Sequence, residues 1–137
     1  MPNWIEFHDS TLTGINAVGQ ACELVLDAYV HSWEARGDEW TGTGLMQVVH
    51  IIVGNAFGPL ASELVLPALI SAGRMRAGGV THDLVPLPFE ASSDVDLSLQ
   101  VDTIGTVTIN GHGVRIEAVG EGRYVEDLPA EWRPNTG

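Results

Sequence analysis

Phe7-His8-Asp9-Ser10 is the short segment of this sequence with the most chemical potential. It places an imidazole beside a carboxylate and a hydroxyl, group types that acid–base catalysis uses. Neighbours along a strand point to opposite faces, however, so adjacency alone does not make a triad. The alternative is a turn closed by Asp9 and Ser10 before a strand at Thr11, with His8 packed or solvated. His8 and Asp9 are therefore the candidate catalytic residues of a protein that we do not expect to be an enzyme.

The histidines raise the question of a metal. A metal site needs three or four ligands that converge from separate segments, and the sequence has no paired cysteines and no His-x-His to supply them. His50 falls on one face of a predicted central strand, where a neutral core histidine is the simpler interpretation. We expect no metal and no cofactor, with His31 and His50 as candidates if a metal binds. The five histidines are His8, His31, His50, His82 and His112.

The tryptophans lie outside the periodic segments and suggest a contact surface. Residues 32–44 contain three glycines and are predicted to form an exposed acidic-aromatic loop. Indoles in loops either cover the end of a core or anchor an interface. The predicted binding residues are Trp33, Glu34, Asp38, Glu39 and Trp40.

Motifs for nucleotide binding and hydrolysis are absent from the sequence. There is no Walker loop, no Gly-x-Ser-x-Gly and no His-Glu-x-x-His. Gly42-Thr43-Gly44 resembles part of a phosphate loop, but a pair of loop glycines is the better interpretation. Cys22 is the only cysteine, so it forms no intrachain disulfide, and we expect it to be a small buried apolar residue.

The charge balance excludes some partners. Eighteen acidic residues face six arginines and no lysine, which gives a net charge of -12. A field of this sign repels phosphate backbones and anionic lipids, so nucleic acid and membrane surfaces are not expected partners. A basic protein or a cation would be attracted, and the alternative is that the charge only keeps the protein soluble. The predicted partner is a basic protein or a second copy of the chain.

The elements that must position these residues are predicted to be β-strands. Residues 94–102 alternate strictly between apolar and polar, as a half-solvated antiparallel strand requires. Residues 104–119 are predicted to form a hairpin whose turn is Asn110-Gly111-His112-Gly113, because Asn and Gly tolerate positive φ. The apolar positions change from odd to even across these four residues, and a turn could absorb that change.

The N-terminal half predicts a second group of strands. Residues 10–18 and 21–31 are expected to form a hairpin closed by Gly19-Gln20, with a bulge at Gly14. Residues 45–53 are apolar on both faces, which is typical of a central strand.

The segment 60–75 could be helix or strand. Pro67 inside a helix would cost about 3 kcal/mol, so we favour a short strand at 63–66. A turn follows at Gly78-Gly79, and residues 84–89 must be extended at a sheet edge because of their prolines. The tail at 129–137 is expected to be loosely ordered.

These elements predict a mainly β protein with little or no helix, either an antiparallel β-sandwich or a partly open barrel of about 7–9 strands. The sandwich is the form that we favour. The 137 residues suit a single domain, residues 1–137. No signal peptide or membrane-spanning run is evident, so a cytoplasmic location is expected.

The chain resembles small β-rich bacterial proteins of unassigned function, some of which are similar to toxin-neutralising immunity proteins. The resemblance is carried by Phe7-His8-Asp9-Ser10 before a strand, and by residues 109–117 leading into Gly120-Glu121. It implies a small acidic β domain and supplies no active-site residues.

The hypothesis that follows is an acidic protein-binding module, of the immunity type or self-associating. One alternative is a carrier or sensor of a small ligand, with a cavity between sheets lined by Tyr29, Met46 and His50. The other is an enzyme that depends on a metal or on a His/Asp pair, which would need at least three histidines and a carboxylate to converge.

Overall fold

The computed structural model describes residues 3–56, 65–102 and 105–133. Nearly all of these residues belong to strands, and one 3-10 turn, η2, spans Ala130–Trp132. Within the described residues, no helix is long and apolar enough to cross a membrane. The strands are β1 (Asn3–Val18), β2 (Ala21–Arg36), β3 (Glu39–Val53), β4 (Ala68–Ala77), β5 (Val80–His82), β6 (Leu84–Leu87), β7 (Phe89–Val101) and β8 (Gly105–Leu128).

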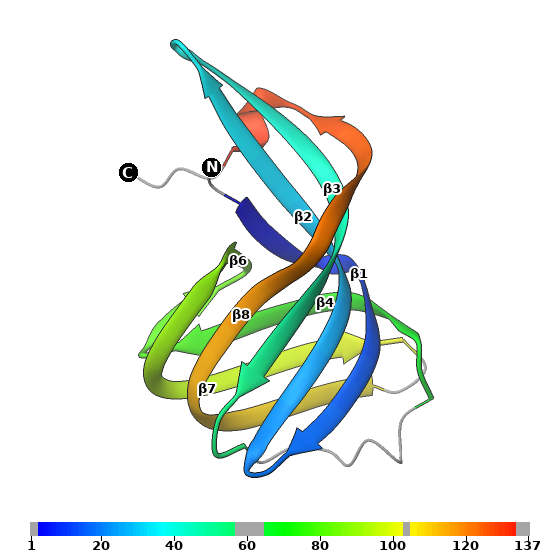
Figure 1. Ribbon diagram of the computed structural model, residues 1–137, viewed down its shortest axis with the longest axis vertical. Coiled ribbons are helices and arrows are strands. Elements are labelled where there is room, and N and C mark those ends of the chain that lie inside the picture. Colours follow the sequence, from blue (N-terminus) through cyan, green and yellow to red (C-terminus); the bar gives the residue numbers. More distant parts are fainter. Residues whose placement is uncertain (1–2, 57–64, 103–104, 134–137) are drawn as a thin grey trace.

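The eight strands form a single antiparallel sheet in the order β5-β4-β7-β8-β3-β2-β1-β6. The sheet curls until β4 reaches β1, where Thr11 pairs with Leu69 and Leu12 with Ala68. This short contact closes the lower part of the molecule into a ring, as Figure 1 shows. The predicted mainly β class is confirmed, and its barrel form describes this sheet better than two stacked layers.

The barrel interior holds the apolar side chains that alternate along the strands. Val95, Leu97, Leu99 and Val101 of β7 are all at most 3 % exposed, so the predicted 94–102 alternation is confirmed. The β1–β2 hairpin, its turn at residues 19–20 and the bulge beside Gly14 are also as predicted. Strand β3 lies between β2 and β8, in the predicted central position.

The predicted loop at 32–44 is wrong, because β2 and β3 pair continuously through it. The register runs from Cys22 opposite Val53 to Arg36 opposite Glu39, and the turn contains only Gly37 and Asp38. This hairpin and the end of β8 extend above the barrel as a twisted arm (Figure 1). Glycines and polar residues obscured the strand pattern, since Gly42 and Gly44 lie inside β3.

The predicted turn at residues 110–113 is also wrong. β8 runs through these residues without reversing, and they pair with β7 and approach Gly54. The change from odd to even apolar positions is absorbed by a bulge, where the register shifts between Ala91 and Asp94 and Gly113 has a φ of 86°. Glycine at positive φ serves a bulge as well as a turn, and local sequence does not separate the two.

The remaining segments were predicted in part. The strand favoured at 63–66 does not form at Val65 and Leu66, while residues 63–64 lie outside the described residues. A strand does form slightly later, as β4, and the Gly78-Gly79 turn follows it as predicted. β6 lies at the sheet edge beside β1. Of the tail, residues 129–133 are described and include η2.

Candidate functional site

The Phe7–Ser10 segment is a bulge inside β1, and it does not precede the strand as predicted. Pairing with β2 stops at Glu6 and resumes at Thr11. Ser10 secures the bulge, because its Oγ donates to the Glu6 carbonyl at 2.7 Å and accepts from the Tyr29 N–H at 2.9 Å. Asp9 adopts a φ of 70°, a left-handed conformation that breaks the alternation of side chains along the strand.

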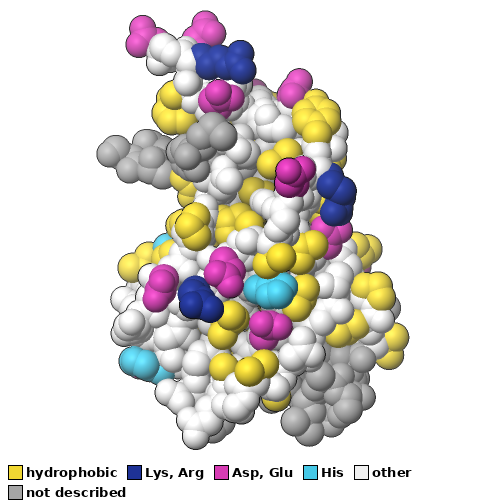
Figure 2. All heavy atoms as spheres, in the orientation of Figure 1, with side chains coloured by type: hydrophobic (Ala, Val, Ile, Leu, Met, Phe, Trp, Pro, Cys, Tyr) yellow, Lys and Arg dark blue, Asp and Glu magenta, His cyan; other side chains and the backbone are white. Residues whose placement is uncertain are grey.

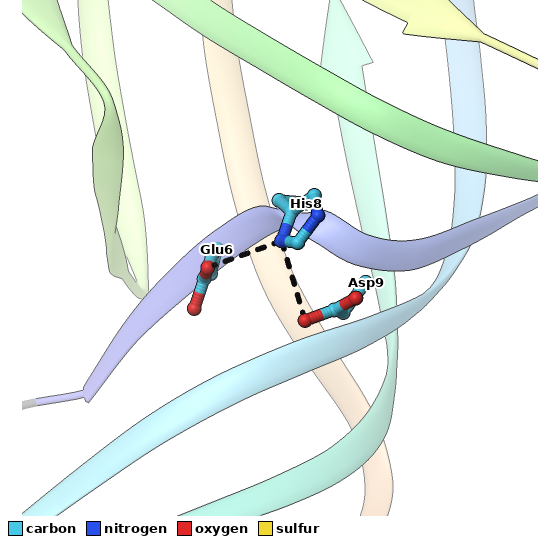
Figure 3. A group of neighbouring side chains, drawn as sticks. All are labelled: Glu6, His8 and Asp9. Carbon is cyan, nitrogen blue, oxygen red and sulfur yellow. Dashed lines mark ion pairs between the residues drawn. The ribbon is translucent and has the colours of Figure 1, made fainter.

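The bulge brings three titratable side chains together (Figure 3). His8 Nδ1 lies 3.6 Å from Glu6 Oε1 and 3.3 Å from Asp9 Oδ2. His8 and Asp9 therefore lie on the same side of β1, whereas adjacent residues of a regular strand point to opposite faces. Their side chains are about 60 % exposed, whereas that of Glu6 is 30 % exposed.

His31 reaches the same group from β2. Its Nε2 lies 2.6 Å from Glu6 Oε2, and its side chain is only 7 % exposed. His31 Nδ1 is buried and has no hydrogen-bond partner among the described residues. One carboxylate, Glu6, thus lies between a buried and an exposed histidine.

Tyr29 occupies the same face of the sheet, two residues before His31 on β2. Its hydroxyl donates a hydrogen bond to the Glu126 carboxylate of β8. The phenol reaches Glu126 by lying over Gly44 of β3, where a Cβ would overlap it. Burial, this hydrogen bond and the charges of nearby carboxylates all raise the pKa of Tyr29. We call the face of β1, β2, β3 and β8 that carries Glu6, Tyr29 and His31 the outer face.

Trp33 continues the outer face, and the structure corrects its predicted role. It is fully buried and lies across Gly42, where any Cβ would overlap the indole. The predicted contact residue is therefore inaccessible to a partner in this conformation. Trp40 is partly buried, with the Arg133 guanidinium 4.4 Å from its ring centroid.

The other predicted binding residues are exposed at the tip of the β2–β3 hairpin. They are Glu34, Asp38 and Glu39. Figure 2 shows acidic side chains at this tip and across the rest of the visible face, with arginines among them. The tip is thus one acidic surface among several.

The remaining histidines do not converge with the bulge. His50 is half-buried, and its Nδ1 lies 3.7 Å from Glu23 Oε2. It is therefore not the core histidine that the sequence predicted. His82 packs edge-on against Phe89, and His112 Nδ1 lies 3.1 Å from Asp94 Oδ1. Among the described residues, the only group of three potential metal ligands is the one on the β1 bulge. The predicted convergence of three histidines is therefore not observed in the described part of the chain.

Three hollows in the described surface lie away from the cavity predicted for a carrier. Their volumes are about 270, 430 and 390 Å³, and none of them is lined by Tyr29, Met46 or His50. One of the two larger hollows is lined mainly by residues of β7 and β8, and the other mainly by residues of β4 and β7. The third is lined by residues around Phe89 and Ile116, where β7 diverges from β8.

Beyond that point β8 has an edge that pairs with no other strand of the described residues. β7 pairs with β8 only as far as Ile116, while β3 pairs with the other side of β8 as far as Leu128. Residues 117–127 are all exposed. Val119, Tyr124 and Val125 are 44, 65 and 47 % exposed, which is unusual for side chains of this size along one strand.

Comparisons with known proteins identify no relative: no family model, no curated protein and no solved structure matches this chain.

Sequence reasoning missed Glu6 and Glu126, and it named Tyr29 only as a lining residue of the predicted ligand cavity. Glu6 and His8 are two residues apart, so strand periodicity could have placed them on one side. The approach of Glu126 to Tyr29 depends on the pairing of β2, β3 and β8, and no local signal in the sequence marks it.

Cys22 is only partly buried, whereas the sequence predicted a buried residue. Burial raises the pKa of its thiol.

Proposed function

We propose that the protein is a binding module that takes up an extended, basic segment of another protein along the open edge of β8. The observation that supports this proposal is the edge at residues 117–128, which no strand in the described part of the chain pairs with. Unpaired N–H and C=O groups at a sheet edge can pair with a strand from a partner.

The exposed apolar side chains favour addition along the edge over docking on one face. Val119 pairs with Val48, whereas Tyr124 pairs with Leu45, and these partners project from opposite faces of β3. A strand laid beside β8 would contact both faces at once. Bulges beside Val119 and Val125 interrupt the edge and limit indiscriminate pairing.

The charge of the edge selects the kind of partner. Residues 117–128 contain four acidic side chains and one arginine, a net charge of -3. A second copy of the chain would bring the same negative excess, so a basic segment is the complementary occupant. A basic toxin held by an acidic immunity-type protein would be one partner of this kind.

The hollow where β7 leaves β8 extends the surface. Pro88 and Phe89 provide its accessible apolar lining, and its charged side chains are Glu90, Arg115 and Glu117, with a net charge of -1. A lysine or arginine of the partner could lay its aliphatic stem on the apolar residues and direct its charge to the carboxylates.

The test uses two designed peptides of twelve residues, one alternating Arg with Val and one alternating Glu with Val. Fluorescence anisotropy should show binding of the basic peptide only, with an affinity that falls steeply as salt rises. Amide resonances of residues 117–128 should shift most on binding. Equal affinity for both peptides, or shifts elsewhere on the protein, would refute the proposal.

Matched charge reversals separate the β8 edge from the hairpin tip. The double variant Glu117→Lys, Glu121→Lys should weaken binding of the basic peptide by about tenfold or more. The control Glu34→Lys, Glu39→Lys changes the net charge equally but should weaken binding less, through the long-range field alone. A larger loss in the control would assign the site to the hairpin tip and exclude the edge.

A further inference from the structure

The side chains on the β1 bulge bring together donor atoms of the types that bind transition-metal ions. Ligand atoms of Glu6, His8 and Asp9 all lie within 4.8 Å of one another. Donors bound at about 2.0–2.2 Å in a tetrahedral site stand about 3.3–3.6 Å apart, close to the 3.3 and 3.6 Å observed from His8 Nδ1. We propose that Glu6, His8 and Asp9 bind a divalent transition-metal cation, with His31 positioning Glu6.

His31 provides an independent observation in support. This side chain is more than nine-tenths buried, it directs Nε2 at Glu6 Oε2, and its Nδ1 has no described partner. The contact of His31 Nε2 with Oε2 holds one oxygen of Glu6 and leaves Oε1 directed toward His8. Metal sites commonly orient a first ligand through a hydrogen bond of this kind.

Residues packed around the bulge make the site electronegative. The carboxylates of Glu6, Asp9 and Glu126 each contribute to the raised pKa of the Tyr29 phenol. Tyr29 therefore stays protonated and donates to Glu126, so it is not a ligand. The net charge of -12 adds a long-range attraction for cations.

The donor set narrows the choice of metal. One imidazole nitrogen and two carboxylate oxygens suit Zn²⁺ or a neighbouring transition metal, whereas Ca²⁺ and Mg²⁺ prefer oxygen alone. Because His8 and Asp9 are exposed, such an ion would keep positions open to water or to an anionic ligand. The three ligands of this site lie on β1 and not on the β8 edge, so neither proposal depends on the other.

The test is titration of the tag-free, metal-depleted protein with ZnCl₂ at pH 7.5 by calorimetry, with the visible spectrum of Co²⁺ as a second readout. We expect one equivalent to bind with micromolar or tighter affinity. His8→Ala and Asp9→Asn should each weaken binding by at least about tenfold. Absence of binding to the wild type, or unchanged affinity in both variants, would overturn the proposal.

His112→Ala is the matched control, because His112 is also exposed and paired with an aspartate but lacks a third ligand. It should leave the affinity for Zn²⁺ unchanged, and a loss equal to that of His8→Ala would show only nonspecific histidine binding. His31→Gln should weaken binding about 10- to 100-fold and retain one equivalent, as expected of a positioning residue. Circular dichroism checks that the His31→Gln variant is folded. Glu6→Gln keeps a hydrogen-bond partner for His31 and should also weaken binding of Zn²⁺. Unchanged affinity in both would remove Glu6 and His31 from the site.

Discussion

Both faces of β2 are buried over residues 28–31, but the two faces carry different kinds of side chain. The barrel face carries apolar side chains that are all fully buried: Leu24, Leu26, Ala28 and Val30. The outer face carries Tyr29, His31 and Trp33, which are at most 7 % exposed and lie outside the main apolar cluster.

This contrast shows how one strand can serve two kinds of packing. The barrel face needs only apolar side chains at alternate positions. The outer face needs glycines at positions 42 and 44, so that the rings of Trp33 and Tyr29 can lie across β3. It also uses carboxylates from β1 and β8 as hydrogen-bond partners of the Tyr29 hydroxyl and of His31 Nε2. The arm above the barrel is therefore a polar-aromatic structure that positions the bulge and the β8 edge.

The largest expected effect tests whether burial on the outer face stabilises the protein as much as burial on the barrel face. Trp33→Ala should reduce the free energy of unfolding by about 3–5 kcal/mol, similar to the 2–5 kcal/mol expected for Leu26→Ala on the barrel face. Urea denaturation monitored by circular dichroism measures both. Trp33→Phe keeps a ring across Gly42 and should cost less than Trp33→Ala. A Trp33→Ala cost below 1 kcal/mol would show that the two faces are not equivalent in stability.

The glycines of β3 give a more specific test. Gly42→Ala places a methyl group into the indole of Trp33 and should cost about 1–3 kcal/mol through overpacking. Gly14→Ala is the matched control, because its Cβ would meet Val25 at an ordinary 3.6 Å. Unfolding curves of both variants should differ clearly. In a Trp33→Leu background the cost of Gly42→Ala should shrink, and a cost that did not shrink would contradict the packing of Trp33 on Gly42.

Tyr29→Phe tests the polar contacts of the outer face. Loss of the hydrogen bond to Glu126 should cost about 1.5 kcal/mol. The pKa of Tyr29 is raised in the folded protein, so this stabilisation is complete below the unfolded value near pH 10 and disappears as pH rises through the higher folded value. Stability curves of wild type and variant should run parallel from pH 6 to 9 and converge only in stronger alkali. Convergence below pH 9 would contradict this assignment.

Much of the fold could be predicted from the sequence, because its strands bury one face and the alternation is visible. Residues 94–102 and the β1–β2 hairpin are examples. The errors lie where glycine has more than one possible use. Gly113 serves a bulge in β8 and not a turn, and Gly42 makes room for an indole inside a strand.

The candidate site was less predictable, because a bulge and long-range pairing create it. His8 and Asp9 were identified, but strand geometry indicated that they diverge. The left-handed conformation of Asp9 reverses that result, and no residue type demands it at this position. His31 was identified as a possible ligand, and its contact with Glu6 follows from the β1–β2 register.

The smallest expected effect concerns an ion pair on the outer face. Arg123 of β8 contacts both carboxylate oxygens of Asp27 at 2.9–3.0 Å, but its side chain is 61 % exposed. Arg123→Gln should therefore cost only about 0.2–1 kcal/mol, because water screens exposed pairs. The cost should vanish in 1 M NaCl, where charges are screened within about 3 Å, whereas that of Leu26→Ala should persist. Thermal unfolding of both variants at low and high salt measures this difference. A salt-independent cost for Arg123→Gln would mean that the aliphatic stem of Arg123 contributes by packing, and the outer face would then resemble the barrel face more closely than its composition indicates.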